Sequence, residues 1–408
     1  MNFADDIHND REYRFPPESL LRHYRAYSTD NENQDFEADL QRITTVLDRY
    51  WTHWELDDIQ IGPTFTVYEI FFPIWPGKKL LSMLDEHFAS ALVVDDVRIL
   101  QDSGRRKIRI EVPNRCRDTI GFYEMLPALK EKHRRIPMVL GRTVSGEDVV
   151  IDVAETPHLL ISGISGSGKT MCLRNLICSM LYTKRPDEVE MDIVDLVSGS
   201  STFPEGIPHL RHPVIKNLEL AWEAMDTLCD EMDRRCGLFN SNRSKSIEDF
   251  NSRTTAGGAA CSRLPYIVFI IDGFEEMILL DGKRFKELAR RITAVGRFCG
   301  IHLVLTTKYP SSKIITGIIR STFPTWIAFE VPDVWNSIAG IGKPGAEKLM
   351  GRGDMLYCNP AIWEPLRLQG PFIGQELEEI ASFLRKSSQS DERACQTENG
   401  GNLDCRKS

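Results

Sequence analysis

Apolar positions in the first third of the chain follow two periods, one helical and one of short strands. Between residues 36 and 135 they predict helices over 36–51 and 80–92, and strands over 65–72, 97–100 and 107–112. The last two strands are separated by Ser103-Gly104, which is typical of a turn. The pattern therefore predicts a small α+β domain over residues 36–135.

A different pattern runs from residue 136 to residue 385. Short, continuous apolar runs alternate with stretches of helical spacing, and they predict strands over 159–162, 189–195, 266–272, 302–307 and 325–329. Strands that alternate with helices usually form a parallel sheet covered by helices. We therefore expect an α/β domain with a mainly parallel sheet over residues 136–385.

The two ends of the chain are more polar. Residues 1–35 form an N-terminal extension whose apolar patch, Pro16, Pro17, Leu20 and Leu21, either docks on a neighbouring unit or belongs to a disordered tail. Residues 386–408 are rich in Ser, Gln, Asn, Gly and charged residues, so we predict a disordered tail there.

Composition narrows the class of protein. No run of the sequence approaches eighteen consecutive apolar residues and the first thirty residues lack a signal peptide pattern, so we expect a cytoplasmic chain without a membrane segment. The ten cysteines are scattered singly, which indicates neither a zinc site nor a disulfide framework. The net charge of −9 argues against coating of nucleic acid by bulk attraction, but leaves room for a local positive surface.

One segment has the spacing G-x-x-x-x-G-K-[ST] of a Walker A phosphate-binding loop. It consists of Gly163, Ile164, Ser165, Gly166, Ser167, Gly168, Lys169 and Thr170. The segment follows an apolar strand and opens a helix, which is the context that the motif requires. The backbone N–H groups would cradle the phosphates of ATP, Lys169 would reach the β- and γ-phosphates, and Thr170 would bind Mg²⁺.

The second half of such a site is an apolar strand that ends in an acidic residue. The run Tyr266-Ile267-Val268-Phe269-Ile270-Ile271-Asp272 supplies it, and Asp272 is expected to hold a Mg²⁺-bound water. The alternative is an aspartate that only caps the next helix.

Many further stretches, in one order along residues 14–384, resemble the FtsK/SpoIIIE family of double-stranded DNA translocases. They include Glu111-Val112-Pro113-Asn114, Glu205-Gly206-Ile207-Pro208-His209-Leu210, Gly300-Ile301-His302-Leu303-Val304-Leu305 and Gly351-Arg352-Gly353-Asp354-Met355-Leu356-Tyr357. The resemblance implies a RecA-like P-loop NTPase domain behind the small domain. It also implies a ring, a hexamer, around duplex DNA, with ATP and Mg²⁺ as ligands.

Several positions depart from the family pattern. Gly273 stands where the family has the glutamate that polarises the attacking water, Lys308 replaces a glutamine, and Trp326 and Ile338 replace arginines that reach a neighbour's nucleotide. Because arginine fingers are worth about 10³ to 10⁵ in rate, hydrolysis is expected to be impaired.

Three residues remain as candidates for the missing groups. Glu275 and Glu276 lie shortly after Gly273, and we assign Glu276, with Lys169 and Asp272, to the catalytic set. Arg297 matches a family arginine and is either a trans contact or a solvated helix residue. Gly273→Glu is expected to restore part of the turnover, and Trp326→Arg to add to it.

Three functions compete at this stage. The first is a DNA translocase with impaired hydrolysis, the second an ATP-gated scaffold or a subunit of a mixed ring with a catalytic relative. The third is a conjugation-type or secretion-type coupling ATPase. The polar segment over residues 240–263 is either a pore loop that contacts DNA phosphates or a surface loop.

Overall fold

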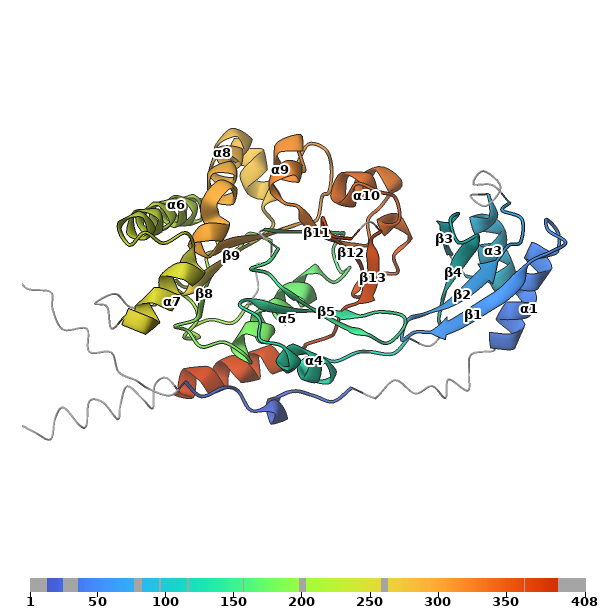
Figure 1. The fold of residues 1–408 in the computed structure, drawn as a ribbon, viewed down its shortest axis with the longest axis horizontal. Coiled ribbons are helices and arrows are strands. Elements are labelled where there is room, and N and C mark those ends of the chain that lie inside the picture. The colour runs from blue at the N-terminus through green and yellow to red at the C-terminus, as the bar shows by residue number, and fades with distance from the viewer. Residues whose placement is uncertain are drawn as a thin grey trace, which may run out of the picture.

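The computed structural model describes residues 13–24, 36–76, 83–94, 97–115, 117–156, 158–197, 203–257, 263–362 and 364–387. The predicted disordered tail therefore lies outside the described residues from position 388 onward. Figure 1 shows a small α+β domain at one end of a larger α/β domain.

The small domain is an antiparallel sheet covered by two helices. Its elements are α1 (Phe36–Leu47), β1 (Glu55–Ile61), β2 (Phe65–Phe71), α3 (Leu84–Leu92), β3 (Arg98–Asp102) and β4 (Lys107–Pro113). The strands lie in the order β1-β2-β4-β3. Ile43 of α1, Phe88 of α3 and Ile110 of β4 are fully buried in one apolar core of this domain. This core forms because one stripe of each helix and one face of the sheet are apolar.

The larger domain contains a nine-stranded sheet with helices around it. Its helices are α4 (Leu126–Glu131), α5 (Lys169–Leu181), α6 (Leu218–Ser241), α7 (Ile247–Gly257), α8 (Glu275–Cys299), α9 (Gly317–Thr322) and α10 (Val334–Ile341). Its strands are β5 (Pro137–Arg142), β6 (Asp148–Asp152), β7 (Leu159–Ser162), β8 (Val189–Asp195), β9 (Tyr266–Asp272), β10 (Ile301–Thr307), β11 (Thr325–Phe329), β12 (Asp354–Cys358) and β13 (Leu366–Gln369).

The strand order is β6-β5-β13-β12-β11-β7-β10-β9-β8. The strands from β11 to β8 are all parallel, which confirms the predicted parallel sheet, while β12, β13, β5 and β6 add an antiparallel half. The parallel half is buried on both faces apart from Glu190 of β8, and it therefore has continuous apolar strands such as β9. The carboxyl ends of these strands lie at one edge of the sheet, where ligands of open α/β sheets usually bind.

The sequence prediction missed the less apolar strands. β1 is an edge strand of largely exposed residues with the sequence ELDDIQI, so it has no apolar alternation to detect. The hairpins β5–β6 and β12–β13 were missed too. The polar segment after residue 240 contains helix α7, and its Arg253 pairs with Asp249 at 2.8 Å, so this part is not the loop that the sequence suggested.

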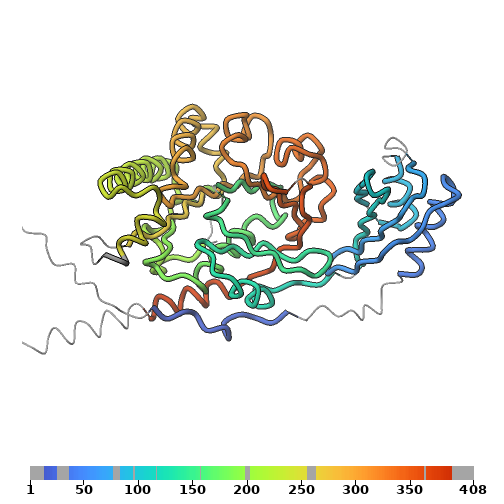
Figure 2. Tube along the Cα trace, viewed as in Figure 1, coloured from blue at the N-terminus to red at the C-terminus, as the bar shows by residue number. Residues whose placement is uncertain are grey.

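The N-terminal segment docks on the larger domain, which resolves the two alternatives for residues 13–24. Leu21 is buried in the large core, and the Tyr182 hydroxyl donates to the Pro17 carbonyl at 3.2 Å. The Tyr24 hydroxyl donates to Glu376 at 3.2 Å, so this segment lies beside the helix over residues 376–387 (Figure 2).

The segment between the two sheets packs with the larger domain. Ile120, Phe122, Leu126 and Leu129 are buried in the large core rather than in the small one. We therefore propose a domain boundary near residue 115 instead of residue 135. None of the helices in the described part of the chain is long and apolar enough to span a bilayer.

Candidate nucleotide site

The predicted phosphate loop joins β7 to α5 at the carboxyl edge of the parallel sheet. Gly163 and Gly168 have φ values of 152° and 131°, which side chains other than glycine rarely adopt. A β-carbon at Gly163 would lie 2.7 Å from Cβ of Phe329, and one at Gly168 would lie 2.8 Å from the Gly353 nitrogen. Glycine is therefore required at both ends of the loop, for backbone conformation and for space.

Backbone hydrogen bonds from three other segments hold this loop in place. The Gly163 N–H donates to the Thr307 carbonyl at 3.2 Å, and the Ile164 N–H donates to the Glu330 carbonyl at 2.8 Å. The Gly353 N–H donates to the Ser167 carbonyl at 2.8 Å. The loop thus has a defined shape, and the first turn of α5 directs its free N–H groups towards the same side.

Lys169 folds back over this loop. Its ammonium donates to the carbonyls of Gly163 and Ile164, each at 2.8 Å. Burial lowers the pKa of Lys169, and the charges of Asp272 and Glu275 oppose that shift. A partly buried ammonium held only by carbonyls would gain a stronger partner in a phosphate.

Asp272 and Thr170 fit a Mg²⁺ site of the kind that uses few protein ligands. Asp272 ends β9, is 4% exposed, and accepts a hydrogen bond from the Thr306 hydroxyl. Burial raises the pKa of Asp272, and the neighbouring charge of Asp195 raises it further. A hydroxyl and a carboxylate are the hard oxygen donors that Mg²⁺ takes alongside phosphates and water. Among the described residues no cluster of three or more His, Cys, Asp or Glu could hold a metal by itself.

The residue after Asp272 cannot easily carry a side chain. Gly273 has φ = 84°, and a β-carbon there would lie 2.3 Å from Cγ2 of Val197. Its N–H donates to the backbone carbonyl of Thr306 at 3.2 Å. A side chain there would strain the backbone and displace the exposed side chain of Val197, and the expectation that Gly273→Glu restores turnover stays a prediction.

The two glutamates that open α8 have different surroundings. Glu275 is fully buried, and its Oε1 accepts a hydrogen bond from the Lys308 N–H at 3.3 Å. Glu276 is partly exposed, and its own N–H donates to the Gly273 carbonyl at 3.2 Å. The structure thus directs Glu275, rather than the predicted Glu276, to the interior of the site.

The positions of the expected trans arginines are occupied differently. Trp326 is 8% exposed, its indole N–H donates to the Phe323 carbonyl, and the Arg320 guanidinium lies 4.9 Å from its ring centre. Arg320 also donates to the Ile338 carbonyl. An arginine at position 326 would therefore place two guanidinium groups side by side in a nearly buried site, which argues against the expected gain from Trp326→Arg.

Arg297 is not part of this chain's own phosphate site. It is an exposed residue in the last turn of α8, next to the start of β10, whereas the phosphate loop contacts the other end of β10. Seven strand residues separate the two ends by roughly 20 Å. Its role as a trans contact stays a prediction.

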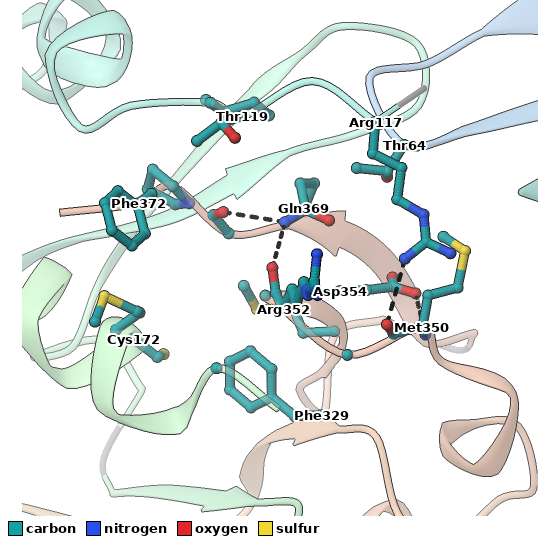
Figure 3. A pocket seen from close by; sticks show the side chains of 18 of the residues that line it. Thr64, Arg117, Thr119, Cys172, Phe329, Met350, Arg352, Asp354, Gln369 and Phe372 are labelled. Carbon is teal, nitrogen blue, oxygen red and sulfur yellow. Dashed lines mark hydrogen bonds between the residues drawn. The ribbon is translucent and has the colours of Figure 1, made fainter. Parts of the chain in front are cut away.

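A cavity of about 350 Å³ adjoins the phosphate loop (Figure 3). It is lined by Gly166, Gly168 and Met171 on the loop side, and by residues of the segment 117–120 and of the β12–β13 hairpin, with Phe372 beyond it. Its size and its mixture of apolar and polar groups suit a nucleoside. Sequence reasoning missed this cavity. The sequence feature that could have indicated this cavity is the run Gly351-Arg352-Gly353-Asp354, whose glycines have φ values of 68° and 96°.

A second group of buried charges lies between the two domains. Arg367 of β13 donates to Asp354 of β12 and to Glu111 of β4, while Arg98 of β3 lies 3.3 Å from Glu111. We call these four residues the interdomain ion cluster. Burial alone would raise the pKa of Glu111, but Arg367 and Arg98 outweigh it and hold that pKa below its usual range.

The loop between a parallel strand and a helix, with an acidic strand end two strands away, defines a P-loop NTPase. The FtsK/SpoIIIE family matches residues 126–312, and the FtsK alpha domain matches residues 15–114. The chain belongs to the FtsK/SpoIIIE family.

Curated relatives agree with this assignment. The chain is 39% identical to a DNA translocase FtsK of Treponema pallidum over 81% of its length, and 34% identical to one of Borreliella burgdorferi over 88%. It covers 42% and 47% of those two proteins, so it spans about half the length of the curated relatives it matches.

Two solved structures share the fold. The pCW3 conjugation coupling protein TcpA, in its monomer form with ATPγS, superposes with a TM-score of 0.60 at 19% identity, over 86% of this chain and 99% of that one. The cytoplasmic domain of the type VII secretion ATPase EccC of Thermomonospora curvata gives 0.57 at 22% identity, over 65% of this chain and 34% of that one. At these identities the likeness concerns the fold alone.

Proposed function

We propose that the chain is the motor part of an FtsK-type translocase, which binds ATP with Mg²⁺ and moves on double-stranded DNA. The observation that carries this proposal is the 39% identity to a DNA translocase over 81% of the chain, because the matched region includes the whole Walker A loop. The shape of that loop, with required glycines and Lys169 at the start of α5, supports ATP as the ligand.

We propose a ring of identical subunits, a hexamer, or a mixed ring with a catalytic relative. Large apolar side chains are exposed on α8 and α10, among them Leu279 at 70% and Trp335 at 76%. Such exposed apolar groups are typical of surfaces that a neighbouring subunit covers. A cytoplasmic location is part of the same proposal, since the cysteines of the described residues are free thiols, as expected in a reducing compartment.

We propose that hydrolysis is slow compared with a fully equipped motor. Gly273 offers no carboxylate, and Trp326 and Ile338 offer no cation to a neighbour's nucleotide. Arginine fingers alone contribute about 10³ to 10⁵ in rate, so ATP would stay bound for long periods. In this proposal the site binds ATP well but hydrolyses it slowly.

Displacement of a third strand from a DNA triplex tests the motor function. The parent protein with ATP is expected to release the third strand from a long duplex, and Lys169→Ala is expected not to. If the parent bound both ATP and the duplex but released no strand, the proposal of movement would be wrong. That result would favour the second candidate, an ATP-gated scaffold. The absence of the family's glutamate at position 273 and of its arginines at positions 326 and 338 already supports this candidate.

A further inference from the structure

One carboxylate in the candidate site has only one of its two oxygens paired within the fold. Glu275 is fully buried at the first position of α8, and its Oε2 has no hydrogen-bond partner among the described residues. An unpaired carboxylate oxygen in the interior is costly, because it loses water without gaining a donor. A native protein usually keeps such a group only where a ligand or a reaction needs it.

The strand order places this carboxylate beside the phosphate loop. β10 lies between β7 and β9, so the segments that follow these three strands meet at one edge of the sheet. The Glu275 side chain leaves the β9 end and reaches the N–H of Lys308, just after β10. The preceding residue, Thr307, accepts a hydrogen bond from Gly163, the first residue of the phosphate loop.

Its charge acts on the two residues expected to hold the nucleotide and the metal. Glu275 opposes the effect of burial on the pKa of Lys169, and adds to burial in raising the pKa of Asp272. Its Oε1 stays fixed by the Lys308 N–H, next to the end of β10. Oε2 is the oxygen without a partner, and because Glu275 is fully buried its side chain must shift for Oε2 to reach a ligand.

The neighbouring positions cannot supply the same group. Gly273 lacks a side chain, and its φ of 84° would strain any other residue placed there. Glu276 leaves the helix about 100° away from Glu275, and it is partly exposed.

We propose that Glu275 is the catalytic carboxylate of this chain, replacing the one absent at position 273. The inference rests on the proposed ATPase function. Its Oε2 accepts a proton from a water whose oxygen attacks the γ-phosphorus. The bond from the γ-phosphorus to the bridging oxygen breaks, and its electron pair remains on that oxygen of ADP. The proton then passes from Glu275 to solvent or phosphate, so the products are ADP and inorganic phosphate.

The test compares Glu275→Gln with Glu276→Gln in the full chain, with duplex DNA present. Glutamine keeps the shape and can still accept from the Lys308 N–H, but it cannot take a proton. Because a positioned base contributes about 10² to 10⁴ in rate, Glu275→Gln should lower kcat by about 100-fold or more. Its Kd for a fluorescent ATP analogue should stay within about twofold of the parent value, which is a small change in binding free energy. Glu276→Gln should leave kcat almost unchanged.

Each outcome decides something. Unchanged turnover in Glu275→Gln overturns the role of Glu275, and so does a parent whose turnover does not exceed that of Lys169→Ala. In both cases the proposed function stands as long as the parent binds ATP. A parent that does not bind the analogue overturns the proposed function itself. If Glu275→Gln does not fold, Glu275→Asp replaces it, since the shorter carboxylate should lower kcat and leave the Kd unchanged.

Discussion

Two groups of buried charges in this molecule behave in opposite ways. In the interdomain ion cluster, burial is outweighed by Arg367 and Arg98, so the pKa of Glu111 is lowered and the carboxylate is charged. In the phosphate site, burial dominates, so the pKa of Asp272 is raised and that of Lys169 is lowered. The interdomain ion cluster joins strands of both domains, whereas the phosphate site lies at the carboxyl edge of the larger sheet.

The difference lies in where each charge finds its partner. The interdomain cluster is complete within the chain, since Arg367 contacts both Asp354 and Glu111. In the phosphate site, the charged form of each group is disfavoured until a ligand of opposite charge arrives. Burial that charges within the chain outweigh therefore indicates a structural role, and burial that they do not outweigh indicates a binding site.

The largest effect is expected from removing the ammonium of the phosphate site. Lys169→Ala should weaken the binding of a fluorescent ATP analogue by on the order of 100-fold or more, because charge-assisted bonds to two phosphates are lost. Equilibrium titration with Mg²⁺ measures this. Lys313→Ala, at an exposed position, is the matched control and should bind as the parent does. Equal affinity of both variants would contradict the proposed cradle.

The interdomain cluster should respond in stability instead. Glu111→Gln leaves Arg367 and Arg98 without their shared carboxylate, so the free energy of unfolding should fall by roughly 3–5 kcal/mol. Urea titration measures it, and Glu69→Gln, which removes one of the two carboxylates beside Lys107, should change far less because Asp57 still pairs with that lysine. Because the pKa of Glu111 is lowered in the folded state, its contribution is present above its unfolded value and is lost as the pH falls through the folded value. If the parent resisted acid and Glu111→Gln lost no free energy of unfolding, the interdomain ion cluster would not have the structural role that distinguishes it from the phosphate site.

Two glycines of the phosphate loop separate crowding from backbone strain. A β-carbon at Gly168 meets the Gly353 nitrogen and Cε1 of Phe329 at 2.8 Å, whereas one at Gly166 meets nothing within 4 Å. Both have positive φ, which costs about 1–3 kcal/mol for another residue. Gly168→Ala should therefore lose ATP binding, and Gly166→Ala should keep it with a smaller loss. If titrations of the two variants gave the same affinity, the contacts with Gly353 would not matter.

The smallest effect concerns stability at the metal position. With a raised pKa, Asp272 binds a proton more readily in the folded state, so its charge costs stability once the pH exceeds the folded value. Asp272→Asn should therefore raise the free energy of unfolding of the ligand-free protein at neutral pH, by on the order of 1 kcal/mol. The same variant should lose the Mg²⁺ dependence of ATP binding. Calorimetry over a series of decreasing pH values checks the sign, because the gain should shrink as the pH falls through the folded pKa of Asp272.

The phosphate loop and the parallel strands could be predicted from local patterns in the sequence. The Walker A spacing needs only eight consecutive residues, and β9 has a continuous apolar run because both of its faces are buried. The edge strand β1 escaped prediction because its polar residues face solvent on most of its length. The fold class could thus be predicted from those elements whose own residues show which of their faces are buried.

Features that depend on side-chain direction were not accessible. Position 276 seemed as suitable as 275 for a carboxylate, and only the course of the chain from β9 into α8 directs Glu275 inward. The obstacle at Gly273 is a contact with Val197, a residue 76 positions earlier in the chain. The interdomain cluster joins positions 98, 111, 354 and 367, and no local pattern indicates such distant pairs.

The central claim, that ATP is bound well and hydrolysed slowly, is tested most directly by steady-state turnover of the purified chain with and without duplex DNA. At saturating ATP and Mg²⁺ we expect fewer than about one turnover per second, well below the usual enzyme median of about 10 per second, with stimulation by DNA. The Lys169→Ala variant gives the background. Several turnovers per second from the parent would contradict the account, because the arginines absent at Trp326 and Ile338 would then not limit the chemistry.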